Sequence, residues 1–185
     1  MEGIVFTKRQ SRHCHRELGY DAAMFALTLA LVLSQHHPAP AETPEAQLAA
    51  VAAVHGEAGP WAVAGYRMGR FALKTLGLPA HSHELRVVHR SPKTPQFACV
   101  ADGAQAATGA SVGKLNLSLE EASLEQLTTT FTHAKTGASV TLKPAKAFVT
   151  RFLNAPREKA LENGRLVLSL KDADVFEVVP PPAPK

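Results

Sequence analysis

The stretch that most constrains the fold of this 185-residue chain runs from Phe97 to Leu117, FACVADGAQAATGASVGKLNL. It is rich in alanine and glycine and poor in polar side chains, which is typical of a segment that packs closely inside a domain. The sequence predicts an apolar, strand-like lead-in ending at Cys99, then a helix of small residues, then a turn at Gly113-Lys114. Five polar side chains of this stretch are candidates to meet in one cleft: Cys99, Asp102, Gln105, Lys114 and Asn116.

This stretch does not contain a nucleotide-binding P-loop. Such a loop needs a glycine, four further residues, a second glycine, a lysine and then Ser or Thr. Here the spacing between Gly109 and Gly113-Lys114 is one residue short, and Leu115 follows the lysine. We therefore expect no nucleotide hydrolysis.

The composition is that of an ordinary globular domain. Hydrophobic residues make up 45% of the chain and charged residues 19%, which is enough to bury one core. The net charge of +4 comes from scattered Lys and Arg residues without a basic run. Because a nucleic-acid surface needs a concentrated basic patch, the sequence predicts no nucleic-acid partner.

Residues 1–41 have the pattern of a signal peptide. Basic residues precede the apolar run AAMFALTLALVL (residues 22–33), which is too short to span a bilayer. Small residues then stand at both positions that a signal peptidase reads in Ala39-Pro40-Ala41. We expect cleavage after Ala41, a periplasmic or secreted location and no stable membrane span. A buried or disordered N-terminal extension is the alternative, and a start at Met24 would leave a signal without basic residues.

Residues 42–179 are expected to form one α+β domain, followed by a proline-rich disordered tail, residues 180–185. Hydrophobic periodicity and Gly or Pro punctuation define the expected elements. Helices are predicted at 44–55, 60–76 and 156–162, strands at 85–89, 126–133, 138–142, 166–170 and 175–179, a loop at 91–95 and a solvated turn at 118–125.

Two pairs of motifs resemble those of a known family, and they occur along the chain in the same order as in that family. CVADGAQ (99–105) and TGASVGKLNL (108–117) match the pattern Cys-x-x-Asp-Ala-x-Gln followed by Thr-Gly-Cys-Thr-x-Gly-Lys-x-Asn-Leu. HGEAGPW (55–61) and GYR (65–67) match in part His-Gly-His-x-Cys-Pro-Gly followed by Gly-Tyr-Arg. These motifs resemble those of the E-type subunit of formylmethanofuran dehydrogenase and its stand-alone bacterial relatives, and the resemblance covers roughly residues 44–179.

The resemblance implies a fold and a metal site. The implied fold is α+β, with helices packed on one face of a mixed, mostly antiparallel sheet, and it agrees with the expected elements. In relatives with the full motifs, His and Cys residues look like a metal site, so His55, Glu57 and Cys99 are the candidate metal ligands here. Glu57 replaces a histidine, whereas Gly59 and Ala110 replace motif cysteines. A divalent transition metal such as zinc is the implied cofactor.

Further residues are candidates for a ligand-binding cleft around this site: Trp61, Tyr66, Arg67, Asp102, Gln105, Lys114 and Asn116. Each also has an ordinary structural explanation. In the same way, His55 is able to cap its helix, Glu57 to be solvated and Cys99 to pack in the core. The resemblance also implies a homodimer, and the predicted helix 60–76, apolar on more than one face, agrees with a helix buried on several sides.

Two functions remain open at this point. The first is an exported binding or carrier protein that holds a metal ion or a metal-containing small molecule in a central cleft. The alternative is an enzyme in which Cys99, His55 and Lys114 act on a small molecule in the same cleft. The resemblance places the redox chemistry of the dehydrogenase in its other subunits, and this chain lacks the cysteine spacing of an iron–sulfur cluster. Binding is therefore favoured over catalysis.

Overall fold

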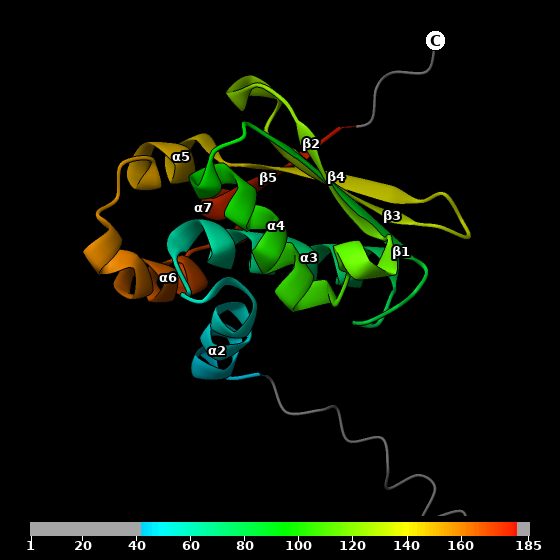
Figure 1. Ribbon diagram of the computed structural model, residues 1–185, viewed down its shortest axis with the longest axis horizontal. Helices are drawn as coiled ribbons and strands as arrows, with labels where there is room; N and C mark the ends of the chain where they lie inside the picture. The colour runs from blue at the N-terminus through cyan, green and yellow to red at the C-terminus, as the bar shows by residue number, and fades with distance from the viewer. Residues whose placement is uncertain (1–41, 181–185) are drawn as a thin grey trace, which may run out of the picture. The chain divides into compact units, whose positions relative to one another are not determined.

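The computed structural model describes residues 42–180, which are built on a five-stranded sheet in the order β2-β1-β3-β4-β5 (Figure 1). The strands are β1 (Leu85–Ser91), β2 (Leu117–Glu121), β3 (Thr128–His133), β4 (Ser139–Pro144) and β5 (Phe176–Val179). Only β1 and β2 pair in parallel, and the other three pairings are antiparallel. The expected mixed, mostly antiparallel sheet is therefore confirmed.

Helices cover one face of this sheet, as Figure 1 shows, and the α+β expectation is confirmed. They are α2 (Pro44–His55), α3 (Pro60–Leu76), α4 (Pro95–Thr108), α5 (Lys146–Phe152), α6 (Ala160–Ser169) and α7 (Asp172–Val175). Both ends of α2 and α3 agree with the prediction, because Pro44 and Pro60 open these helices and Gly56 and Gly77 cap them.

The sheet is two-sided because its side chains alternate between core and solvent. Along β1, Leu85, Val87 and His89 are buried. On the opposite face, Arg90 pairs with Glu120 at 2.8 Å across β1 and β2. Charged and hydroxyl side chains therefore cover the outer face, and the helices cover the inner face.

The closest contact in the core joins α3 to α4 through glycine. A Cβ placed on Gly103 would lie 1.7 Å from the carbonyl oxygen of Ala62, and one on Gly65 would lie 2.0 Å from the carbonyl oxygen of Val100. No real Cβ atom approaches another atom so closely. The predicted close packing of the small-residue stretch is confirmed, and its partner is the backbone of α3.

The structure corrects the predicted start of this stretch. Cys99 does not end a strand, because α4 already begins at Pro95, and Pro95-Gln96 is not part of a loop. Proline suits the first helical turn, where its missing N–H is not needed. Cys99 therefore lies in the second turn of α4, and Asp102 lies one turn beyond it on the same side.

Three further expectations were wrong. Residues 118–125 do not form a solvated turn, since Leu117–Glu121 is strand β2, whose acidic side chains pair with Arg90 and Lys93 on the exposed side. Residues 166–170 are not a strand, and Asn163-Gly164 does not end a helix, because both lie within α6. Gly164 is needed there because a Cβ would lie 1.9 Å from the carbonyl oxygen of Ala58. Helix α5 was not foreseen.

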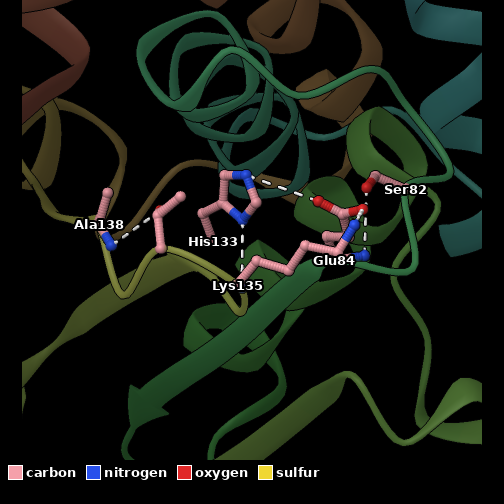
Figure 2. Close-up of polar contacts among 6 residues, drawn as sticks. Ser82, Glu84, His133, Lys135 and Ala138 are labelled. Atoms are coloured by element: carbon pink, nitrogen blue, oxygen red, sulfur yellow. Dashed lines mark hydrogen bonds and ion pairs between the residues drawn. The ribbon is translucent and has the colours of Figure 1, made fainter.

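Figure 2 shows how the tip of the β3–β4 hairpin is attached to the start of β1. The carboxylate of Glu84 accepts a hydrogen bond from Nζ of Lys135, which lowers the pKa of Glu84, and it lies 3.6 Å from Nε2 of His133. The backbone amide of Ala134 donates to the carbonyl of Glu84 at 2.7 Å. These contacts support the register that pairs Leu85 with His133.

The apolar faces of α3 are covered within one copy of the chain by α4, α6 and the sheet. The feature that agreed with a homodimer therefore has another explanation, and the homodimer stays a prediction. Among the described helices, none has the length and apolarity needed to cross a bilayer. Residues 1–41 and 181–185 lie outside the described residues, so the signal peptide and most of the predicted tail stay predictions.

We predict that Gly103→Ala destabilises the protein by at least about 2 kcal/mol, because α3 or α4 must shift as a body to admit the methyl group. In a solvent-exposed helix the same change would stabilise the protein by about 1 kcal/mol. The sign of the change in the free energy of unfolding therefore distinguishes a close helix contact from an open one. Gly113→Ala is the matched control, since a Cβ at that position would have nothing within 4 Å. Urea unfolding measures both, and equal midpoints for the two variants would contradict the close contact.

His89 is the polar centre of the core under β1. It is 1% exposed, its Nε2–H donates to the carbonyl of Phe97 (3.1 Å), and its Nδ1 accepts from Oγ1 of Thr129 (2.9 Å). Burial lowers the pKa of His89 from 6.5 to about 4. The histidine is therefore neutral in the folded protein, and it links β1 and β3 to the first turn of α4.

We predict that acid weakens the fold through this residue. Because folding lowers the pKa of His89, its contribution is complete above about pH 6.5 and is lost as the pH falls toward 4. The free energy of unfolding should fall by up to about 3 kcal/mol across that window from this group alone. Urea unfolding between pH 4 and 7 should show a smaller decrease in His89→Gln, and identical pH profiles would rule out the assignment.

Candidate functional site

Two hollows flank the N-terminal half of α4 and share His55, Pro95 and Cys99 in their walls. The larger, which we call the turn hollow, has a volume of about 860 Å³ and is bounded by the α2–α3 turn, the start of α4 and the α5–α6 connection. The smaller, the strand hollow, has a volume of about 290 Å³ and lies between α4 and β2. The candidate metal ligands His55, Glu57 and Cys99 all line the turn hollow.

The α2–α3 turn places His55 and Glu57 at the mouth of the turn hollow. Gly56, with φ of 89°, ends α2 in a conformation that L side chains rarely adopt. Gly59 then caps α3, and only Ala58 of this turn is buried. The turn is therefore tight, and the side chains of the two candidate ligands, His55 and Glu57, are exposed.

His55 is held by Asp102, which lies 47 positions later in the chain. Nδ1 of His55 is 2.8 Å from Oδ2 of Asp102, and the two side chains are 31% and 45% exposed. Since an ionised carboxylate only accepts hydrogen bonds, Nδ1 carries the proton in the neutral imidazole. Nε2 then keeps its lone pair, and it has no hydrogen-bond partner among residues 42–180.

Cys99 is a buried thiol beside this pair. Its Sγ–H donates to the carbonyl of Gln96 at 3.1 Å. Burial, and secondarily the negative charge of Asp102, raises the pKa of Cys99 from 9.0 to about 12. The side chain is therefore a thiol at neutral pH, and its hydrogen bond is to a carbonyl rather than to His55.

The described residues do not form a complete site for a bare metal ion. Within residues 42–180, no three His, Cys, Asp or Glu side chains are grouped so as to hold one. A structural zinc site needs four ligands, and a catalytic site needs three with one position open. The arrangement provides one imidazole whose Nε2 has no hydrogen-bond partner among residues 42–180, with the Asp102 carboxylate on its Nδ1 and the Cys99 thiol in the same two hollows.

Three of the other predicted cleft residues also line these hollows. Trp61 forms a wall of the turn hollow, and Asp102 and Gln105 line the strand hollow. Trp61 is also a core residue, since its indole N–H donates to the carbonyl of Phe152 at 3.1 Å and its ring packs edge-on against Phe97 and Phe148. Its orientation is therefore fixed from behind the hollow.

The other four predicted cleft residues lie elsewhere. Tyr66 and Arg67 line a third hollow, farther along α3, where Arg67 binds the carbonyl of Val167 and the carboxylate of Asp172. Arg67 comes six positions after Trp61 in α3, which places it about 9 Å farther along the helix axis. The prediction of a single cleft was therefore wrong for Tyr66 and Arg67, which line a separate hollow.

Lys114 and Asn116 follow the far end of α4. Nζ of Lys114 donates to the carbonyl of Gly109 at 2.7 Å. Asn116 holds the turn to β1, because its Oδ1 accepts from the amide of Ser111 and its Nδ2 donates to the carbonyl of Leu85. Both residues therefore support the chain between α4 and β2, away from His55.

Sequence reasoning missed the part of the turn hollow that comes from the C-terminal third of the chain. Phe152 and Arg157 line it from there, and Nε2 of Gln96 in α4 donates to the carbonyl of Leu153. The usable signal was the spacing of Phe148 and Phe152, which places both rings on one helical face.

A family model described as "FmdE, Molybdenum formylmethanofuran dehydrogenase operon" matches residues 54–177. This match takes in both hollows, the whole sheet up to the first half of β5, and all motifs singled out in the sequence. The chain belongs to the FmdE family. No curated protein sequence matches the chain.

We predict that Cys99 reacts at least about 100-fold more slowly with iodoacetamide at pH 8 in the folded protein than in the unfolded protein, since reactivity follows the thiolate fraction. Cys14→Ser leaves Cys99 as the only reporter. Asp102→Asn should accelerate the reaction because it removes a negative charge near the thiol. A folded rate equal to the unfolded one would contradict the burial and the raised pKa of this thiol.

Proposed function

We propose that this protein binds a metal-containing small molecule in the turn hollow and acts outside the cytoplasm as a binding or carrier protein. The observation that carries the proposal is the His55–Asp102 pair, in which Nδ1 is bonded and Nε2 has no hydrogen-bond partner among residues 42–180. Histidines that ligate metals almost always donate their other ring N–H to such a partner, which fixes the ring and raises its basicity.

A single imidazole suits a metal that brings its own ligands better than it suits a bare ion. A chelated metal with one open axial position needs one protein donor, whereas bare zinc needs three or four. The grouping of acidic, thiol and imidazole side chains in residues 42–180 offers no such set. A zinc ion held by His55, Glu57 and Cys99 stays the alternative, and it would require the thiol of Cys99, whose pKa is raised, to lose its proton.

The walls of the turn hollow suit a flat organic chelate. Pro60, Trp61 and Phe152 provide apolar surface, and Arg157 provides a cation. The volume of about 860 Å³ lies within the range of small-molecule sites, roughly 300–1,000 Å³. The hollow is thus large enough for a ligand, with few polar groups to fix its orientation.

The enzyme alternative has less support. It assigned roles to Cys99, His55 and Lys114 together, but Lys114 bonds to Gly109 and lines neither hollow. The pKa of Cys99 is raised rather than lowered, contrary to what an activated nucleophile needs.

The proposal of an extracytoplasmic location rests on the signal-like pattern of residues 1–41 alone.

We predict that iron protoporphyrin IX, used as a probe for flat chelates, binds the purified protein with a saturable shift of its Soret band. His55→Ala should weaken binding at least about tenfold because the axial donor is lost. Asp102→Asn should weaken binding by a smaller factor, because the imidazole remains and only the partner that orients it is lost. His83→Ala is the matched control, because His83 is exposed and lines neither hollow.

Parallel titrations with zinc ions distinguish the two ligand classes. Tight zinc binding that is lost in both His55→Ala and Cys99→Ala would favour a bare-ion site. Protoporphyrin binding of equal strength in wild type, His55→Ala and His83→Ala would refute the proposed axial role of His55.

A further inference from the structure

The third hollow, which we call the basic hollow, lies along α3 and has a volume of about 830 Å³. Its lining includes the apolar side chains Phe71, Leu73 and Leu78. The same lining carries three cationic side chains, Arg67, Arg70 and Lys74, together with Tyr66. Among the residues that line it, Asp172 is the one acidic side chain.

Two of these cations remain available to a ligand. Arg67 is 14% exposed and is engaged by Val167 and Asp172, so it serves the packing of α3 against α6 and α7. Arg70 is 55% exposed, and its nearest acidic oxygen is 3.9 Å away. Lys74 makes no ion pair among the described residues 42–180.

A carboxylate of the chain itself, that of Glu42, already contacts two residues that line this hollow. Oε2 of Glu42 accepts a hydrogen bond from the phenol of Tyr66 at 2.6 Å and is the acidic oxygen that lies 3.9 Å from Nη1 of Arg70. Tyr66 is 2% exposed, so its ring is fixed and its hydroxyl is aimed at this position. Nε2 of Gln47 donates to the backbone carbonyl of Glu42 at 3.1 Å and holds the segment in place.

We propose that the basic hollow is a second binding site, for an amphipathic organic carboxylate, and that Glu42 occupies its carboxylate position when no such ligand is bound. The phenol of Tyr66 and the guanidinium of Arg70 recognise the carboxylate, Lys74 adds a second cation, and the apolar side chains of the lining contact the hydrocarbon part. The ligand displaces Glu42, which precedes the first helix and moves without unfolding α2.

This site is separate from the one that contains His55. The turn hollow and the basic hollow share no lining residue. The inference therefore does not depend on the proposed function, and either is able to fail without the other.

Calorimetric titration with octanoate tests this inference. The tethered carboxylate of Glu42 competes at an effective concentration on the order of millimolar, so Glu42→Ala should bind octanoate about tenfold more tightly than wild type. Glu45→Ala is the matched control, because it removes the same charge three residues away at an exposed position outside the hollow. It should leave octanoate binding at the wild-type level.

Two further measurements identify the recognition groups. In the Glu42→Ala background, Arg70→Met together with Lys74→Met should reduce octanoate affinity at least about tenfold, and octylammonium should not bind at all. Octanoate affinity that is the same in wild type and Glu42→Ala would overturn the competition. Affinity that survives the loss of both cations, or no saturable binding in any variant, would overturn the site.

Discussion

The contact between the backbones of α3 and α4 is the constraint on which the rest of this structure depends. At Gly65 and Gly103 each helix presents a carbonyl oxygen to the other at a separation that excludes any Cβ. The two helices therefore form one thin layer against the sheet, and side chains from α2, α5 and α6 close around its ends. This contact fixes the position of the N-terminal half of α4, and with it the positions of Cys99 and Asp102. Asp102 then forms the contact with His55 that joins α4 to the end of α2.

The parts of the fold that could be predicted are those in which local signals and tertiary packing agree. Proline at the start and glycine at the end allowed α2 and α3 to be predicted. Alternating apolar and polar residues around a glycine-containing turn allowed the β3–β4 hairpin to be predicted. Prediction failed where packing overrides a local signal. Gly164 is typical of a helix end, yet it lies inside α6 because its missing side chain admits the carbonyl of Ala58. Strand β2 was obscured by acidic residues whose partners, Arg90 and Lys93, lie far away in the sequence.

The candidate site was predictable in part for a related reason. Residues close together in the motif His55–Trp61 remain close in space, because a short turn joins two helices. Motif residues farther along a helix separate at about 1.5 Å per residue, so Tyr66 and Arg67 reach a different hollow. Lys114 and Asn116 follow the far end of α4, where they hold the turn into β2. The one contact that defines the site, between His55 and Asp102, joins two motifs, and no spacing within either motif encodes it.

His89 connects the buried sheet to the wall of the turn hollow. Its ring is bonded to the carbonyl of Phe97, and the ring of Phe97 packs against Trp61 with centroids 5.2 Å apart. Proton binding at His89 and the ligand binding that we propose beside Trp61 would therefore draw on the same arrangement of the first turn of α4. Since thermodynamic coupling is reciprocal, a ligand that favours this arrangement makes the folded chain more resistant to acid. By the same coupling, protonation of His89 would weaken the binding of such a ligand, although the two would not touch.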